Sequence, residues 1–232
     1  VFFPTERGNI HIKNLYRGVS IQGGAGSGKS ETFFKPILGE TARQGLTGLL
    51  YDFKSPELTK AALNAYSLRP DISTFNVDFK SPETSDRVNP LNPCYLLKQA
   101  YIQEYSLILI NNLMPETVKQ GDMNFWAGNA RMILAGLAWY FKKHNQQFCT
   151  IPHVVASVLY GDFSKITERL NQDNEAGGML SSLRESLERE ASDQTAGVLS
   201  TLKIAVSKIN DPEIYWILSG NDFSLHLNDP QN

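Results

Sequence analysis

The segment GGAGSGKS at residues 23–30 constrains this chain more than any other feature, because it matches the pattern G-x-x-x-x-G-K-[ST] in full. In this pattern the glycines let consecutive backbone N–H groups turn inward around phosphate oxygens, with no Cβ in the way. The lysine reaches the β- and γ-phosphates, and the serine hydroxyl binds Mg²⁺. The segment therefore predicts a site for a nucleoside triphosphate, with ATP and Mg²⁺ as the expected cofactors.

The predicted site consists of this loop and the residue after it. Lys29 and Ser30 are the expected catalytic residues, and Ser30 is also the expected Mg²⁺ ligand. The alternative is a flexible Gly/Ser turn, which the strand pattern before the loop and the helix pattern after it disfavour. The residues expected to bind the cofactor are Gly23, Gly24, Ala25, Gly26, Ser27, Gly28, Lys29, Ser30 and Glu31.

The first ninety residues alternate strand and helix patterns. Residues 18–22, 48–53 and 73–79 are predicted strands, and the continuous apolar run at 48–53 suits a strand that is buried on both faces. Two predicted helices separate these strands. The first begins at Lys29 and ends at the glycine at position 45, and the second covers residues 56–68. Pro36 predicts a kink or break in the first helix. This order predicts an α/β fold with a parallel sheet and right-handed crossovers.

The pattern becomes helical after the sequence NPLNP at residues 89–93. Apolar residues at helical spacing predict helices over residues 101–113, 125–143 and 198–209, and place Leu180, Leu183 and Leu187 on one face of another. The predicted domains are residues 1–93 (the first part of a nucleotide-binding domain), 94–222 (an all-α domain) and 223–232 (a return to the first).

A second Mg²⁺ ligand is harder to place. Asp52 follows an apolar run, as the carboxylate of a Walker B strand does, and Asp78 follows a poorer copy of that pattern. No apolar run ends in Asp-Glu. Asp52 is the candidate metal ligand, and a solvated charge at the end of a strand is the alternative.

Charge and cysteine content exclude several classes of protein. Lys and Arg number 22 and Asp and Glu number 24, which gives a net charge of −2 and no overall basic field that would attract nucleic acid. Cys94 and Cys149 cannot make a disulfide framework and lack the spacing of metal ligands. The sequence shows no secretory signal and no apolar run that would span a bilayer. We expect a soluble segment of a longer protein in a reducing cytosol.

The order of motifs resembles the type IV coupling proteins of conjugation and secretion (TraG/TraD-like), particularly the mobilisation type of Bacteroides relatives. The matching pieces are RG at residues 17–18, the loop at 23–30, YDFKSPEL at 51–58, RVNPLN at 87–92, FWAGNAR at 125–131, VLSTL at 198–202 and NDFSL at 221–225. Phe53 and Ser55 stand where the family has Pro and Gly.

The resemblance implies the first part of a RecA-like ATPase with an inserted all-α domain. Such proteins form hexameric rings at the cytoplasmic face of the bacterial inner membrane, and hydrolyse ATP to move DNA with its relaxase into a type IV secretion channel. The membrane anchor would then precede Val1. Walker B and any arginine finger would follow Asn232, so this segment alone is expected to hydrolyse ATP weakly or not at all.

Two other functions fit the sequence. One is another RecA-like DNA pump, such as a septal translocase or a viral packaging motor; the other is a non-hydrolysing adaptor that docks the relaxosome. The helical part is expected to recognise cargo. Its polar stretches at residues 172–178 and 181–193 are acidic on balance and favour a protein partner over bare DNA. The basic group Lys142, Lys143 and His144 is interpreted as a charge complement at a helix C-terminus, with contact to DNA phosphate as the alternative.

Overall fold

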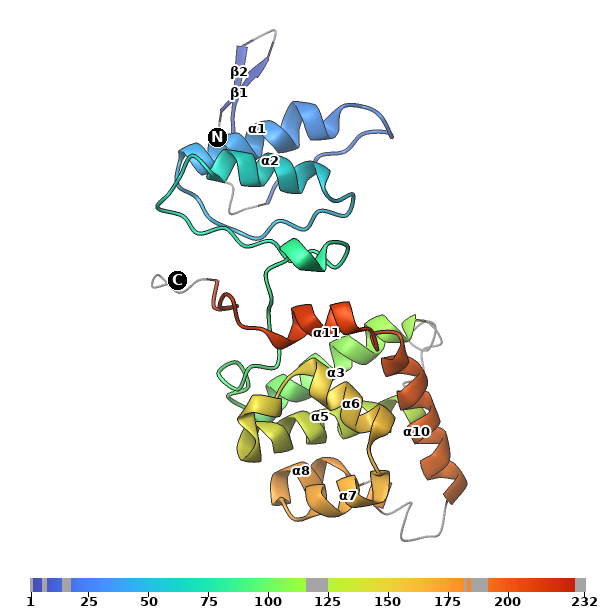
Figure 1. The fold of residues 1–232 in the computed structure, drawn as a ribbon. Coiled ribbons are helices and arrows are strands. Elements are labelled where there is room, and N and C mark those ends of the chain that lie inside the picture. The colour runs from blue at the N-terminus through green and yellow to red at the C-terminus, as the bar shows by residue number, and fades with distance from the viewer. Residues whose placement is uncertain are drawn as a thin grey trace. The chain divides into compact units, whose positions relative to one another are not determined.

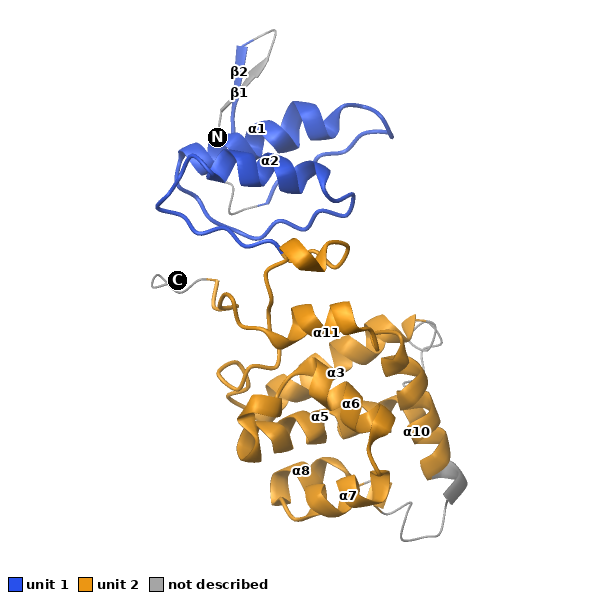
Figure 2. Cartoon of the chain, viewed as in Figure 1, with its two compact units in different colours: residues 1–76 blue, residues 77–232 orange. Residues whose placement is uncertain are grey.

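The computed structural model describes residues 2–5, 8–13, 18–115, 125–181, 183–184 and 192–227. The chain divides into two compact units, Val1–Asn76 and Val77–Asn232 (Figure 2). This division falls before the proline-rich residues 89–93, at which the sequence changes to a helical pattern.

The first unit contains a strand pair and two neighbouring helices (Figure 1). Strand β1 (Phe2–Thr5) pairs antiparallel with β2 (Gly8–His11), so that Phe2 lies opposite His11. A π-helical turn, η2 (Ser30–Phe34), leads directly into α1 (Lys35–Arg43), and α2 (Glu57–Tyr66) follows. Both predicted helices of this unit are therefore present.

The end of α1 has the geometry that its glycine predicts. Gly45 has a φ of +71°, a left-handed conformation that glycine adopts without a steric penalty. Its N–H donates to Ala42 O at 3.0 Å, and the N–H of Leu46 donates to Thr41 O at 2.9 Å. These two bonds form a Schellman motif and satisfy carbonyls at the end of the helix.

Helices α1 and α2 run in the same direction. At their starts, Lys35 Nζ lies 3.6 Å from Glu57 Oε1. At their ends, the Tyr66 hydroxyl donates to Leu46 O, just beyond α1, at 2.6 Å. The two helices therefore have their N-termini together.

The predicted parallel sheet is wrong. In the part of the chain that the structure describes, the only sheet is the antiparallel pair β1–β2, and residues 18–22, 48–53 and 73–79 form no strands. A parallel strand needs ladder partners and cover on both faces. Leu49, Tyr51 and Phe53 are instead 84%, 83% and 83% exposed. The described structure is mostly helical, and the α/β, RecA-like class drawn from the sequence is corrected accordingly.

The second unit is a bundle of helices around α5 (Phe125–His144). The structure confirms the predicted helices over residues 101–113 and 125–143, and much of the predicted helix over residues 198–209. Of the three leucines predicted to share a helix face, Leu180 and Leu183 are buried, and Leu187 lies outside the described residues. The other elements are η3 (Pro82–Thr84), α3 (Gln99–Leu113), η4 (Gln146–Phe148), α6 (Ile151–Tyr160), α7 (Phe163–Asn171), α8 (Asn174–Met179), α10 (Ser192–Ser207) and α11 (Pro212–Ser219).

Helix α5 forms the centre of the core because it is apolar on most of its circumference. Ala130, Leu134 and Ala138 are among its buried residues. A Cβ on Gly136 would lie 2.8 Å from Leu180 Cδ1, and a Cβ on Gly197 of α10 would lie 2.5 Å from the Trp126 ring. The small residues therefore let neighbouring segments approach α5 closely. None of the described helices has the length and apolarity that crossing a bilayer requires.

Candidate functional site

The loop at residues 23–30 is exposed and turns sharply at two glycines. Gly26 and Gly28 have φ angles of +73° and +78°, which a residue with a Cβ adopts only at a steric cost. Ser27 N–H donates to Gly24 O at 3.3 Å and closes a turn inside the loop. A Cβ on Gly23 would lie 2.7 Å from Ser27 Oγ, so the Ser27 side chain would have to move if glycine were replaced there.

The side chain of Lys29 folds back into this loop. Its Nζ donates to Gly23 O and Gly24 O, both at 2.7 Å, and to Ser27 Oγ at 3.3 Å. The ammonium group is therefore held inside the curve of the loop, beside the start of the helix at Ser30. A lysine in this position brings a positive charge to any anion that the loop binds.

The helix after the loop begins with a wide turn. Residues Ser30–Phe34 are π-helical, and Lys35 N–H donates to Ser30 O. Pro36 is the second residue of α1, so the change from π-helix to α-helix falls beside the proline at which the sequence predicts a kink or break. Glu31, part of the predicted nucleotide site, pairs with Lys35. That hydrogen bond is the main reason why the pKa of Lys35 lies above its usual value.

Asp52 acts as a remote cap for α2. The residue at the cap position, Pro56, makes no side-chain cap, and Asp52 Oδ2 instead accepts from Leu58 N and Thr59 N at 3.0 Å and from Thr59 Oγ1 at 3.1 Å. Desolvation raises the pKa of Asp52, but the bonds from Thr59, Leu58 and Lys54 outweigh it and hold the pKa below its usual value. The structure thus gives Asp52 a structural role, and its role as a Mg²⁺ ligand stays a prediction.

The basic end of α5 is engaged with acidic residues at the start of α8. Lys143 Nζ lies 2.6 Å from Asp173 Oδ2 and 3.0 Å from Glu175 Oε2, and His144 Nε2 lies 2.9 Å from Asp173 Oδ2. Trp139 Nε1 also donates to Glu175 Oε2, at 2.8 Å. Lys143 and His144 thus bind acidic side chains at the helix end, which leaves them poorly placed to bind DNA phosphate.

Asp173 corrects one expectation about the acidic surface. The sequence predicted that residues 172–178 form an exposed polar stretch, but the Asp173 side chain is only 5% exposed. Its charge is directed at Lys143 and His144 and not at solvent. Most of the second predicted acidic stretch, residues 181–193, lies outside the described residues.

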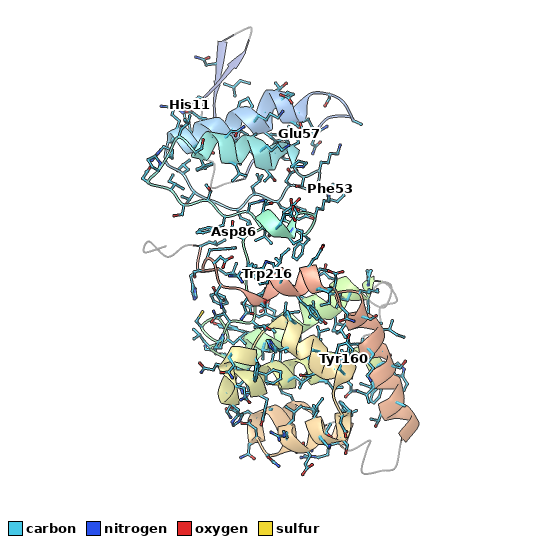
Figure 3. The ribbon with its side chains drawn as sticks, in the orientation of Figure 1. His11, Phe53, Glu57, Asp86, Tyr160 and Trp216 are labelled. Atoms are coloured by element: carbon cyan, nitrogen blue, oxygen red, sulfur yellow. The ribbon has the colours of Figure 1, made fainter. Side chains whose placement is uncertain are left out.

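Two segments far apart in the sequence meet in the second unit, and we call residues 87–95 and 216–226 together the junction. Arg87 N and Nε donate to Asp222 Oδ2 at 2.9 and 3.1 Å, and Arg87 Nη2 donates to Asp222 Oδ1 at 2.8 Å. The guanidinium lies 4.5 Å from the centre of the Trp216 ring, which projects from α11 (Figure 3). A Cβ on Gly220 would lie 2.3 Å from Arg87 Cβ, so glycine is needed for this approach.

Further hydrogen bonds, from backbone and side-chain groups, join the two segments of the junction on both sides of this ion pair. Three of them are Val88 N to Ile217 O at 2.8 Å, Asn92 Nδ2 to Asn221 Oδ1 at 2.9 Å, and Leu225 N to the Tyr95 hydroxyl at 2.8 Å. Both segments contain motifs that carry the family resemblance, but those motifs did not predict that the segments touch. No local pattern signals a contact across 135 positions.

A protein-family model matches most of the chain and shows its family. The model described as type IV secretory system conjugative DNA transfer matches residues 6–228. The chain belongs to this family. No match was found among curated proteins or among solved structures.

Membership in the conjugative DNA transfer family confirms the resemblance to TraG/TraD-like coupling proteins. It connects the chain with type IV secretion and DNA transfer, and it favours conjugation over a septal translocase or a packaging motor. The residues that the resemblance rested on, from the loop at 23–30 to residues 221–225, fall within the matched range.

Proposed function

We propose that the loop at residues 23–30 binds ATP with Mg²⁺, and that the full-length protein hydrolyses ATP to drive DNA and its relaxase into a type IV secretion channel. One observation carries the proposal. The Lys29 ammonium lies within the curve of a glycine loop, directly before a helix that runs from Ser30 to Arg43. A positive side chain and a helix N-terminus together form an anion site.

The loop residues fit a polyphosphate. Gly26 and Gly28 have positive φ angles, so the loop can present backbone N–H groups around an anion. The loop is also exposed, which leaves it accessible. Among the described residues, no group of three or more His, Cys, Asp or Glu side chains could hold a metal ion by itself. Mg²⁺ would therefore arrive with the nucleotide, as it does where it keeps several waters and few protein ligands.

Each loop residue has a role that its position suggests. Lys29 would exchange its bonds to Gly23 O and Gly24 O for bonds to the β- and γ-phosphate oxygens, and so neutralise charge that develops there. The Ser30 hydroxyl would orient the metal, which, when bound, neutralises the phosphates further. The backbone N–H groups of residues 24–30 would fix the position of the polyphosphate.

The binding part of the proposal is tested with a fluorescent ATP analogue and Mg²⁺. We expect Lys29→Ala to weaken binding roughly tenfold to a hundredfold, because one or two charge-assisted hydrogen bonds are lost. Lys60→Ala removes an exposed lysine on α2 and serves as the matched control, with unchanged affinity. Equal affinity of the Lys29→Ala variant and the unaltered chain would contradict the proposed site.

The hydrolysis part is tested in the full-length protein. Lys29→Ala should abolish conjugative transfer while leaving the circular dichroism spectrum unchanged. A full-length protein that binds ATP without turnover, yet supports transfer, would favour the non-hydrolysing adaptor instead. Assembly as a hexamer, and a membrane anchor outside this chain, belong to the same proposal.

A further inference from the structure

A polar cavity of about 410 Å³ opens beside the junction, where both junction segments meet the turn η4. Its size falls within the range of ligand pockets, about 300–1,000 Å³. None of the described side chains that line it is charged. Its hydrogen-bonding side chains include Asn89, Asn92, Asn221, Gln146, Gln147 and Thr150.

Part of this lining is fixed by bonds within the unit. Asn89 Nδ2 donates to Cys149 O at 2.9 Å, and its Oδ1 accepts from Leu91 N at 3.0 Å. Asn92 is held in the same way, because Nδ2 donates to Asn221 Oδ1 and Oδ1 accepts from Cys94 N at 3.1 Å. These amides form a wall that is already in place before any ligand arrives.

Other groups of the lining have no partner among the described residues. They are the two primary amides of Gln146 and Gln147 and the Nδ2 group of Asn221. Both glutamines lie on the exposed turn η4, so their amides can reach into the cavity without disturbing the core. The pocket therefore combines a rigid wall with free donors and acceptors.

This chemistry suits the main chain of a polypeptide. A primary amide carries a donor and an acceptor in one plane, and in an extended chain the N–H and C=O of one residue point to the same side, so the two can form paired hydrogen bonds. A phosphate or carboxylate would find no cation in the lining, and Arg87 of the junction is already held by Asp222. Single-stranded nucleic acid would need a basic groove and aromatic rings for its bases, and the lining contains neither.

We propose that this cavity binds an extended segment of a partner protein, recognised through its main chain and uncharged at the residues that enter. Gln146, Gln147 and Asn221 would bond the peptide units, and Pro93 would supply an apolar contact. The proposal is independent of nucleotide binding, since it uses only residues of the second unit.

Cys94 provides a reporter for this site. It lies in the lining and is exposed, whereas Cys149 is buried and desolvation raises its pKa to about 12. N-ethylmaleimide should therefore modify Cys94 and spare Cys149 in the folded chain. A ligand in the cavity should slow the modification of Cys94.

The experiment uses linear dodecapeptides selected from a random displayed library on the complete chain. We expect selected peptides to slow Cys94 modification severalfold, and the double variant Gln146→Ala, Gln147→Ala to weaken their binding roughly tenfold or more. Gln172→Ala alters an exposed glutamine outside the pocket and should leave affinity unchanged. Continued protection of Cys149 shows that each variant is folded.

Three results would overturn the proposal. The first is that no selected peptide slows Cys94 modification. The second is that the double variant binds the peptides as tightly as the unaltered chain. The third is that a single-stranded DNA oligonucleotide of mixed sequence, and no peptide, protects Cys94, which would make the cavity a nucleic-acid site.

Discussion

At the scale of single residues, the Asp173 side chain forms hydrogen bonds or ion pairs with four described residues of the second unit. Its Oδ1 accepts from Glu175 N and Ala176 N, both at 3.0 Å, and so caps α8. Its Oδ2 binds Lys143 and His144. A carboxylate that is only 5% exposed is stable as an anion only when it is paired and hydrogen-bonded in this way.

We expect Asp173→Asn to lower the free energy of unfolding by about 2 kcal/mol at neutral pH, because the amide keeps a cap acceptor but loses the charge that faces Lys143 and His144. Urea unfolding measures this difference. Asp162→Asn is the matched control, since Asp162 caps α7 with the same geometry but is exposed, and its variant should lose less. Equal losses from the two variants would contradict the role of burial.

The effect of Asp173 should depend on pH with a defined sign. Desolvation raises its pKa, but hydrogen bonds from Lys143, Ala176, His144 and Glu175 outweigh this and hold the pKa below its usual value. A carboxyl with a lowered folded-state pKa stabilises the fold above its unfolded pKa, about 3.9, and loses that contribution as the pH falls through the folded value. The stability difference between the unaltered chain and Asp173→Asn should therefore shrink below about pH 4. A difference that stays constant into strong acid would show that the charge is not responsible.

At the scale of elements, two glycines set how closely the second unit packs around α5. Gly197 of α10 faces the Trp126 ring, and Gly136 of α5 faces Leu180. A Cβ on Gly128, also on α5, would face open space, with none of the described neighbouring atoms within 4 Å. The same residue type is therefore required at two positions and dispensable at a third.

Gly197→Ala should destabilise the unit by about 2 kcal/mol, because the new methyl group overlaps the Trp126 ring in a packed core. Gly128→Ala should instead stabilise it by about 0.5 kcal/mol, since alanine restricts the unfolded chain and meets no neighbour. Thermal unfolding of both variants tests the pair. Similar shifts in one direction would contradict the close contact between α10 and α5.

The sequence predicted the helices of this chain better than its strands. Helices such as α3 and α5 follow from their own residues, because their hydrogen bonds are local and the apolar spacing identifies the buried face. A strand also needs a neighbour, which its own residues do not specify. The apolar run at residues 48–53 thus predicted a buried strand, whereas Leu49 and Tyr51 are exposed and no sheet of the described chain covers them.

The same distinction applies to the candidate sites. The pattern at 23–30 can be recognised because its residues are contiguous, and its role as a nucleotide site stays a prediction. The cap that Asp52 supplies to Thr59 depends on the turn between them, and the pairing of Arg87 with Asp222 depends on the whole bundle. Contacts of the second kind carry no signal in the spacing of residues.

At the scale of the whole molecule, the junction closes the helical unit on itself. Arg87 and Asp222 are joined by side-chain and backbone bonds, including Asp222 N to Arg87 O at 3.0 Å, and Trp216 packs against the guanidinium. A guanidinium that donates two hydrogen bonds to one carboxylate fixes the relative orientation of the two groups. The junction thereby holds together the two ends of a segment of more than a hundred residues.

A double-mutant cycle tests this closure. Arg87→Ala and Asp222→Ala should each lower the melting temperature of the second unit, and the double variant should lose less than the sum, because both single changes break the same pair. Asp211→Ala, which removes the cap of α11 and makes no bond to Arg87, is the control and should add to either change. Additive losses from Arg87→Ala and Asp222→Ala would show that the pair is not coupled.

The backbone bonds of the junction have a consequence for how such a protein can evolve. Val88 donates to Ile217 and Asp222 to Arg87, so the chain enters and leaves the helical bundle at the same point. Recombination could therefore exchange the intervening bundle for one of different length and surface, as a cassette, without changing the distance that the flanking chain must bridge. Lineages would then change the bundle and its surface while the loop at residues 23–30 stays unaltered.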